Sequence, residues 1–260
     1  MKKTDKKRTT RITRKPKLDF YFIPSMFTAG NAVFGFLSII YTFKGKFFQA
    51  ALFIFFAAIF DFFDGRIARF LKVASDFGTE LDSLCDAISF GVAPAFLAYS
   101  WALKGVEPFS IIIASIFMLA GIIRLARFNV IHLNNPSSNQ IYTGLPIPMA
   151  ASSIFSAVLI HPEPITSKTF SLLFGFWVIL FAYFMISKIK FRSFKELKMK
   201  SRNFLPLLFS SIIILGLVYY TGYTIAIVLY SYLLYNFFRL VLLKKKPAKT
   251  EEYEFKAKKS

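Results

Sequence analysis

Residues 47–64 read FFQAALFIFFAAIFDFFD, and this stretch decides the class of fold. The run from Phe47 to Phe60 contains no charged residue, and it would make about 21 Å of α-helix at about 1.5 Å per residue. Asp61 and Asp64 then follow without a break in the apolar pattern. Because about 20 mostly apolar residues are enough to cross a bilayer, the stretch predicts a transmembrane helix with acidic side chains near one end.

The composition of the whole chain agrees with this interpretation. Hydrophobic residues make up 55% of the 260 residues and the mean hydropathy is +0.53, whereas soluble domains are usually about 45–50% apolar. The apolar residues form unbroken runs such as Ser210–Tyr220, which excludes a soluble globule, a disordered protein and a coiled coil. Cys85 is the only cysteine, so no intramolecular disulfide is expected. The first apolar segment is too long for a signal peptide and is expected to remain as a helix.

Eight transmembrane helices are predicted on this basis. They cover residues 20–43, 48–71, 80–103, 108–128, 145–162, 168–187, 204–221 and 223–243. The last two are separated only by Thr221-Gly222-Tyr223, which predicts a tight hairpin. The expected fold is therefore an all-α polytopic transmembrane helix bundle. It consists of a six-helix core over residues 18–190 and an accessory hairpin over residues 204–243, with basic segments at 1–17, 191–203 and 244–260.

The distribution of charge predicts the orientation of these helices. The chain has 33 Lys+Arg against 14 Asp+Glu, a net charge of +19. With a cytoplasmic N-terminus, all basic residues except Lys44, Lys46, Lys104 and Lys168 lie on the cytoplasmic side, which is a strong positive-inside pattern. We attribute the basic excess to orientation and to anionic lipid headgroups, with nucleic-acid binding as the less favoured alternative. Residues 188–202 are expected to lie along the interface as an amphipathic stretch.

Four aspartates occupy positions where a membrane protein seldom places a charge. Asp61 and Asp64 are spaced i,i+3, and Asp82 and Asp86 are spaced i,i+4, so each pair shares one face of its helix. An ionised side chain at the centre of a bilayer costs about 2.5–3.5 kcal/mol or more, and such residues usually have a function. Since the second and third predicted helices are adjacent and antiparallel, they can direct all four carboxylates to one point.

These carboxylates need a counterion. Salt bridges to Arg66 and Arg69 are one possibility, but two arginines cannot neutralise four carboxylates. Two divalent cations fit better, and oxygen-only ligands favour Mg²⁺ or Mn²⁺. Two such ions suit chemistry on a phosphate. The small residues beside the acids serve either close helix packing or the approach of a nucleotide diphosphate, and we favour the nucleotide. They are Gly65, Ala68 and Gly78.

Written out, the segment is Asp61-x2-Asp64-Gly65-x2-Ala68-Arg69-x8-Gly78-x3-Asp82-x3-Asp86. It resembles the signature of the CDP-alcohol phosphatidyltransferase family. The resemblance implies a six-helix core that is usually dimeric, with a two-metal site in a cavity that opens to the cytoplasm. It also implies transfer of a phosphatidyl group from a CDP-linked lipid to an alcohol, with release of CMP.

The resemblance also implies roles for individual residues. All four aspartates resemble metal ligands, and Asp86 additionally resembles the general base for the attacking hydroxyl. The positions that resemble the CDP site are Gly65, Arg69 and Ser75, with Ala68 and Gly78 leaving space for the nucleotide. A looser match in the first predicted helix, Pro24, Thr28 and Asn31, resembles polar lining beside the nucleotide, although simple interhelical hydrogen bonds would explain the same residues.

Three further stretches resemble the phosphatidylserine synthase branch of this family. They are Ser89–Pro94 (SFGVAP), Arg124–Asn129 (RLARFN) and Gly144–Pro148 (GLPIP). The resemblance implies CDP-diacylglycerol and L-serine as substrates, and an enzyme of the cytoplasmic membrane whose active site faces the cytoplasm. Glycerol 3-phosphate, inositol phosphate and choline remain alternative acceptors.

Two arginines at the end of the fourth predicted helix are candidates for binding anionic groups. Arg124 and Arg127 are spaced i,i+3 and can clamp the acceptor carboxylate or a lipid phosphate, or simply anchor the helix at the cytoplasmic rim. A divalent-cation transporter is a rival function for the acidic cluster. It is less favoured because transporters usually hold ions near the midplane between repeated halves, and residues 110–243 contain no second copy of the motif.

Overall fold

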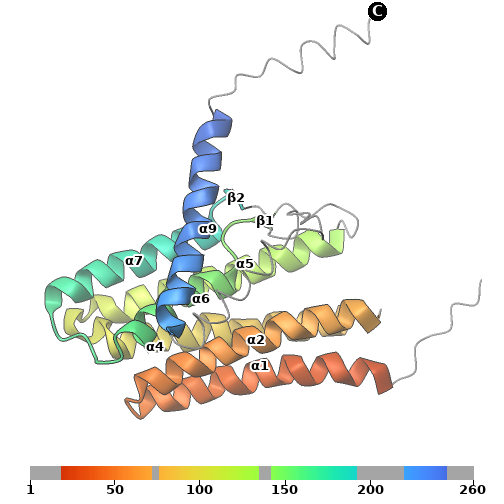
Figure 1. The fold of residues 1–260 in the computed structure, drawn as a ribbon, viewed down its shortest axis with the longest axis horizontal. Coiled ribbons are helices and arrows are strands. Elements are labelled where there is room, and N and C mark those ends of the chain that lie inside the picture. Colours follow the sequence, from red (N-terminus) through yellow and green to blue (C-terminus); the bar gives the residue numbers. More distant parts are fainter. Residues whose placement is uncertain (1–18, 72–75, 135–141, 192–219, 245–260) are drawn as a thin grey trace, which may run out of the picture.

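A computed structural model describes residues 19–71, 76–134, 142–191 and 220–244, and its described part is almost entirely helical. Figure 1 shows α1, α2, α5 and α7 running side by side along the long axis of the bundle. The helices are α1 (Asp19–Phe43), α2 (Phe47–Leu71), α3 (Asp76–Asp86), the π-helix η1 (Ala87–Val92), α4 (Ala93–Trp101), the 3₁₀-helix η2 (Leu103–Val106), α5 (Phe109–Asn134), α6 (Ile147–Ile160), α7 (Lys168–Ile186) and α9 (Thr221–Lys244). Two short strands, β1 (Tyr142–Thr143) and β2 (Lys190–Phe191), pair antiparallel.

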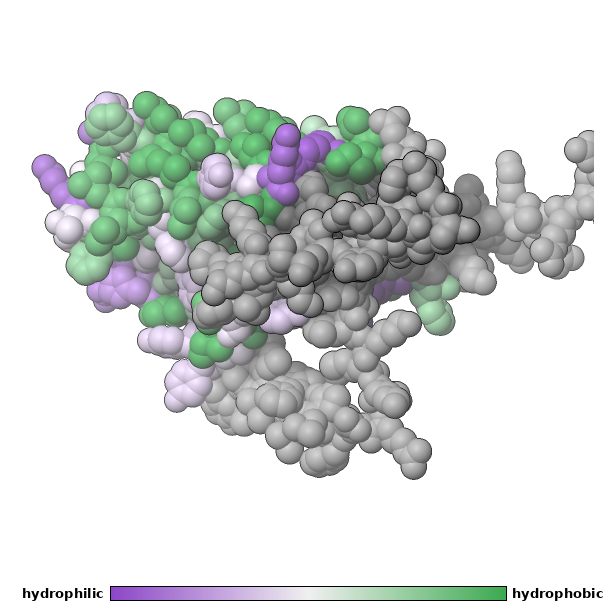
Figure 2. Space-filling view, turned by 90° about the horizontal axis from the view of Figure 1, so that it is seen from above, coloured by the Kyte–Doolittle hydropathy of each residue, from purple (hydrophilic) through white to green (hydrophobic). Residues whose placement is uncertain are grey.

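Five helical segments are long and apolar enough to cross a membrane. They are Ser25–Phe43, Phe47–Ile67, Phe77–Trp101, Phe109–Ile131 and Lys168–Ile186. Large apolar side chains on their outer faces are exposed, among them Ile111 and Leu119 on α5 and Phe176 on α7. Figure 2 shows that apolar residues dominate the face of the described part seen there, with hydrophilic side chains restricted to a few patches. The predicted all-α transmembrane bundle is thus confirmed.

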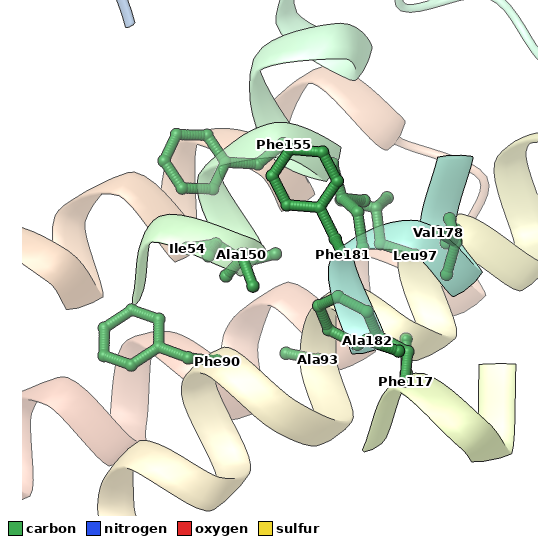
Figure 3. Close-up of a cluster of buried hydrophobic side chains, with 14 of the residues drawn as sticks. Ile54, Phe90, Ala93, Leu97, Phe117, Ala150, Phe155, Val178, Phe181 and Ala182 are labelled. Atoms are coloured by element: carbon green, nitrogen blue, oxygen red, sulfur yellow. The ribbon is translucent and has the colours of Figure 1, made fainter. Parts of the chain in front are cut away.

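The core lies where α4, α6 and α7 meet the hairpin of α1 and α2. Figure 3 shows this cluster, in which Ile54 of α2, Leu97 of α4, Phe155 of α6 and Phe181 of α7 all point inward. Each of these side chains is at most 2% exposed. Alanines at many of the contact positions let the helix backbones approach one another closely. The core therefore holds the helices together on one side of the bundle and leaves their outer faces for lipid.

The third predicted helix is interrupted in the middle. It begins at Asp76 as α3, changes to the π-helix η1 directly after Asp86, and returns to α-helical geometry in α4. Ser89, Phe90 and Gly91 of η1 are buried. π-Helical turns occur frequently at functional sites, and this one separates the acidic half of the segment from the half that packs in the core.

The predicted number of eight transmembrane helices is not confirmed. Seven of them correspond to described helices, but only five described segments are long and apolar enough to cross a membrane, and α6 has 14 residues, too few to span a bilayer unaided. Residues 204–219 of the seventh lie outside the described residues, as do the basic tails and most of the segment 191–203. Lys190 and Phe191, which we expected in an amphipathic stretch, form β2 instead.

The predicted position of the turn in the C-terminal hairpin is wrong. Thr221, Gly222 and Tyr223 do not form a turn, because they are the first residues of α9. Gly222 packs so closely on Leu159 and Ile160 that an added Cβ would lie about 2.9 Å from each side chain. This contact fixes the start of α9 at the end of α6, and Figure 1 shows α9 (blue) running across the other helices rather than alongside them.

Candidate active site

The predicted acidic residues come together from two helices, α2 and α3. Asp61 and Asp64 lie in the last turns of α2, and Asp82 and Asp86 lie in α3. α1 contacts both α2 and α3, whereas no comparable backbone packing joins α2 to α3 within the described ranges. Carboxylate oxygens of Asp61, Asp64 and Asp82 nevertheless lie within 4.8 Å of one another. The spacing of the aspartates in the sequence therefore produces the expected convergence.

Asp86 is placed beside this group and is held by α1. Its side chain is 8% exposed, and its Oδ1 accepts a hydrogen bond of 3.1 Å from Nδ2 of Asn31. Asn31 is completely buried. The charges of Asp61 and Asp86 also act on each other. Asp86 thus joins the acidic cluster to α1, 55 residues earlier in the sequence.

A second contact sets the depth at which α1 sits against η1. Oγ of Ser89 donates a hydrogen bond of 2.9 Å to the backbone carbonyl of Asn31. One turn later on α1, Gly35 lies directly against Ser89, where an added Cβ would be 2.7 Å from the Ser89 Cα. Only glycine leaves room for this approach. The close contact at Gly35 therefore supports the hydrogen bond between Asn31 and Asp86.

The cluster has the donor atoms of a hard-metal site. Oδ1 of Asp82 is buried and accepts no hydrogen bond from the described residues, as expected of an atom that binds a cation. All the donors are carboxylate oxygens, the ligands that Mg²⁺ and Mn²⁺ prefer. The guanidinium of Arg66 lies 3.9 Å from the centre of the Phe62 ring. The four residues therefore fit divalent metal ions.

Several residues predicted to hold CDP lie on the same helices as the cluster or on α1. Gly65 follows Asp64 on α2, Gly78 lies one turn before Asp82 on α3, and Thr28 is a buried residue of α1. Ala68 and Arg69 belong to α2, but their side chains lie outside the described part. Ser75 is likewise outside the described residues, and only the backbone of Pro24 is described, within α1. Asn31 was predicted to line the CDP site, whereas in the structure its side chain donates a hydrogen bond to Asp86.

The two candidate arginines have different surroundings. Arg124 lies within electrostatic reach of Asp61, so its charge acts on the acidic cluster. Arg127 instead donates a hydrogen bond of 3.0 Å from Nη1 to the carbonyl of Ile186, at the end of α7. A carbonyl in the last turn of a helix lacks an intrahelical donor, and a cation there is favourable. Arg127 therefore stabilises the junction between α5 and α7.

A glycine that the sequence alone did not explain completes this junction. Gly144 has φ of +84°, and a Cβ on it would meet the Met185 carbonyl and lie 2.9 Å from Nη2 of Arg127. Its N–H donates to the carbonyl of Ile189, and the next N–H, of Leu145, donates to Phe184. With the pairing of β1 and β2, these bonds tie the entry of α6 to the end of α7. The GLPIP stretch thus has a structural role that its turn-forming residues could have indicated.

Comparison with known proteins agrees with this geometry. The sequence model described as CDP-alcohol phosphatidyltransferase matches residues 21–190, which include every residue of the acidic cluster. The chain belongs to the CDP-alcohol phosphatidyltransferase family. The match covers α1 to α7 and stops before α9. The acidic cluster therefore lies in the part of the chain that is shared with the family.

Curated relatives within this family have closely related names. A CDP-diacylglycerol–serine O-phosphatidyltransferase of Bacillus subtilis is 38% identical over 176 residues, covering 67% of this chain and 92% of the relative. One of the same name from Helicobacter pylori is 34% identical over 180 residues, covering 68% and 75% respectively. An archaetidylserine synthase of Methanothermobacter thermautotrophicus is 37% identical over 174 residues, covering 66% and 70%. This family member is therefore similar to transferases named for serine as acceptor.

Proposed function

We propose that this protein transfers the phosphatidyl group of CDP-diacylglycerol to the hydroxyl of L-serine, giving phosphatidylserine and CMP. One observation carries the proposal: three carboxylates converge, with Asp86 acting electrostatically on them, within a chain that is 34–38% identical to enzymes named CDP-diacylglycerol–serine O-phosphatidyltransferase. The apolar helices suit a lipid substrate, because its acyl chains can stay in the bilayer while its diphosphate reaches the acidic cluster.

Asp61, Asp64, Asp82 and Asp86 are the residues that would hold divalent metal, Mg²⁺ or Mn²⁺, with two ions proposed. When bound, such ions supply positive charge that stabilises negative charge developing on the phosphates. The residues proposed to hold the CDP portion are Gly65, Ala68, Arg69, Ser75, Gly78, Thr28 and Asn31. The two glycines flank the cluster where the backbones of α2 and α3 are not packed together, which favours this placement of the nucleotide.

Asp86 is the proposed general base. In the transfer, an O–P bond forms between the serine hydroxyl oxygen and the lipid-bearing phosphorus, and the bond from that phosphorus to the CMP oxygen breaks. The hydroxyl proton passes to Asp86. Because Asn31 donates to Oδ1 of this carboxylate, Oδ2 is the oxygen proposed to accept the proton. A neutral hydroxyl is a poor nucleophile, so a positioned base contributes about 10²–10⁴-fold to the rate.

The substrate's anionic groups need cationic partners near the cluster. Arg124, which acts electrostatically on Asp61, is the proposed contact for the acceptor carboxylate or a lipid phosphate. Arg127 is proposed to share this clamp through guanidinium N–H groups other than the one that Ile186 accepts. A bidentate Arg–carboxylate pair is directional as well as strong, which favours an amino acid over choline as the acceptor.

The positive-inside pattern supports an enzyme of the cytoplasmic membrane whose site faces the cytoplasm. A homodimer is proposed from the family resemblance, and cross-linking in intact membranes would test it. Cysteine labelling from either side of sealed vesicles, with single cysteines placed near Asp64 and near Gly45, would test the orientation.

The acceptor is tested directly by competition between alcohols. The purified full-length protein is given CDP-diacylglycerol with Mn²⁺ or Mg²⁺ and, in turn, L-serine, glycerol 3-phosphate, inositol phosphate or choline. We expect L-serine to give the highest kcat/KM for CMP release and a phosphatidylserine product identified by mass spectrometry. Faster release with another alcohol would keep the chemistry and replace the acceptor.

A further inference from the structure

A side-chain bridge joins α3 to α5 beside the acidic residues of α3. Oγ of Ser83 donates a hydrogen bond of 3.0 Å to Oδ1 of Asn129, and Nδ2 of Asn129 donates one of 3.2 Å to Oε2 of Glu80. Asn129 therefore uses both ends of its amide on a single helix. It is the last residue of the RLARFN stretch, and the proposed function leaves it without a role.

The bridge is placed to control the rotation of α3 about its axis. Successive residues of an α-helix turn by about 100°, so Glu80 and Ser83 lie near one face and Asp82 and Asp86 lie on another, well away from Glu80. α3 has 11 residues, and its backbone packs against α1 and η1. Within the described ranges it has no comparable backbone packing on α5. Two hydrogen bonds to one side chain therefore link α3 to that helix.

The two bonds also require an amide at this position. An asparagine accepts from the Ser83 hydroxyl with its oxygen while it donates to the Glu80 carboxylate with its nitrogen. An aspartate of the same shape keeps the first bond and faces Glu80 with a second negative charge. A leucine of similar size makes neither bond. Substitutions at position 129 can therefore remove the hydrogen bonds while the size of the side chain stays nearly the same.

We propose that Asn129 is a positioning residue for the acidic cluster: by holding Glu80 and Ser83, it fixes the rotation of α3 and so the distances of Asp82 and Asp86 from Asp61 and Asp64. The inference rests on the proposed function only in assigning metal to these carboxylates. Asn129 contacts neither substrate nor metal in this scheme. Its effect reaches the site through the orientation of α3 alone.

Mn²⁺ binding to the purified full-length protein, measured by electron paramagnetic resonance without substrate, tests the proposal. Residues that support metal ligands typically contribute 10–100-fold to affinity, so we expect Asn129→Asp to weaken Mn²⁺ binding by about 10-fold. Combining Asn129→Asp with Glu80→Gln should restore the affinity to within about threefold, because Gln Nε2 can donate to the new aspartate. Glu80→Gln alone, which keeps an acceptor for Asn129, is the matched control and should bind like wild type.

The outcomes separate the alternatives. Wild-type Mn²⁺ affinity in folded Asn129→Asp protein would overturn the proposal, and so would a double variant that stays as weak as the single one. If Asn129→Asp does not fold, Ser83→Ala removes one bond at little steric cost. It should weaken Mn²⁺ binding by about threefold, and an unchanged affinity there would equally overturn the proposal. Because Mn²⁺ binding is measured without an acceptor, failure of the serine assay would leave this result unaffected.

Discussion

Replacing Gly35 with alanine should disturb Asp86, the proposed general base, from a position outside the proposed substrate and metal contacts. The new Cβ would lie 2.7 Å from the Cα of Ser89 and 2.9 Å from its Cβ, as well as against its Oγ. Carbon atoms in contact are normally about 3.5–4.0 Å apart. Because one of the obstructing atoms belongs to the backbone of η1, no side-chain rotation relieves the clash. α1 and η1 must therefore separate by about 1 Å.

This separation acts directly on the proposed base. Asn31 lies one turn before Gly35 on α1, and Asp86 lies three residues before Ser89. Their hydrogen bond is 3.1 Å long, and an added displacement of about 1 Å takes it beyond bonding distance. Misplacement of a catalytic group by about 1 Å can reduce the rate by about 10²-fold. We therefore expect kcat for CMP release to fall by about 10- to 100-fold, with the KM for CDP-diacylglycerol changed less than threefold.

The assay compares kcat, KM and the thermal unfolding temperature of Gly35→Ala with those of wild type in the same detergent. Val33→Ala is the matched control, because Val33 is on the exposed face of the same helix at 57% exposure. That control should keep wild-type kcat. A folded Gly35→Ala protein that also keeps wild-type kcat would refute the argument that the contact at Gly35 positions Asp86. A raised KM with unchanged kcat would instead favour Asn31 as a nucleotide contact.

Three further predictions concern the site and its supporting junction. Asp86→Asn should reduce CMP release by about 10²–10⁴-fold while equilibrium binding of CDP persists, and near-normal turnover would exclude Asp86 as the base. Removal of divalent metal with EDTA should abolish CMP release, and added Mn²⁺ or Mg²⁺ should restore it; activity that survives exhaustive chelation would contradict the metal assignment. Gly144→Ala should lower the thermal unfolding temperature, because left-handed backbone costs a non-glycine residue about 1–2 kcal/mol and the Cβ also meets the Met185 carbonyl and Arg127. An unchanged unfolding temperature would show that the strand junction is not held in this form.

The acidic cluster was predictable because it depends on the spacing of residues that are close together in the sequence. The spacings of Asp61 with Asp64 and of Asp82 with Asp86 fix a shared face on each helix, and only four residues separate the two helices in the sequence. The partner of Asp86 was not predictable in the same way. Asn31 is 55 residues away, and its contact with Asp86 depends on how α1 packs against η1, where Gly35 lies against Ser89.

Other features depend on long-range contacts or on very short elements. Arg127 looked like an anion clamp in the sequence, whereas its bond to Ile186 arises from the folding of α5 against α7. The two-residue strands β1 and β2 have too few residues to give an alternating pattern. The direction of α9 is set by the contact of Gly222 with the end of α6, and hydropathy reports only how apolar a helix is, not the direction in which it runs.

The π-helix η1 has a consequence for how this protein can change. A residue inserted into a helix turns everything after it by about 100° relative to everything before it. The wider turn of η1 therefore lets one chain segment present Asp86 to the acidic cluster and, a few residues later, Ala93 and Leu97 to the core, each in its own phase. Within Ala87–Val92, exchange of one side chain for another alters a local contact. Loss of a single residue would rotate one half of the segment relative to the other. The segment would then lose either the alignment of Asp86 with the acidic cluster or the packing of Ala93 and Leu97 in the core.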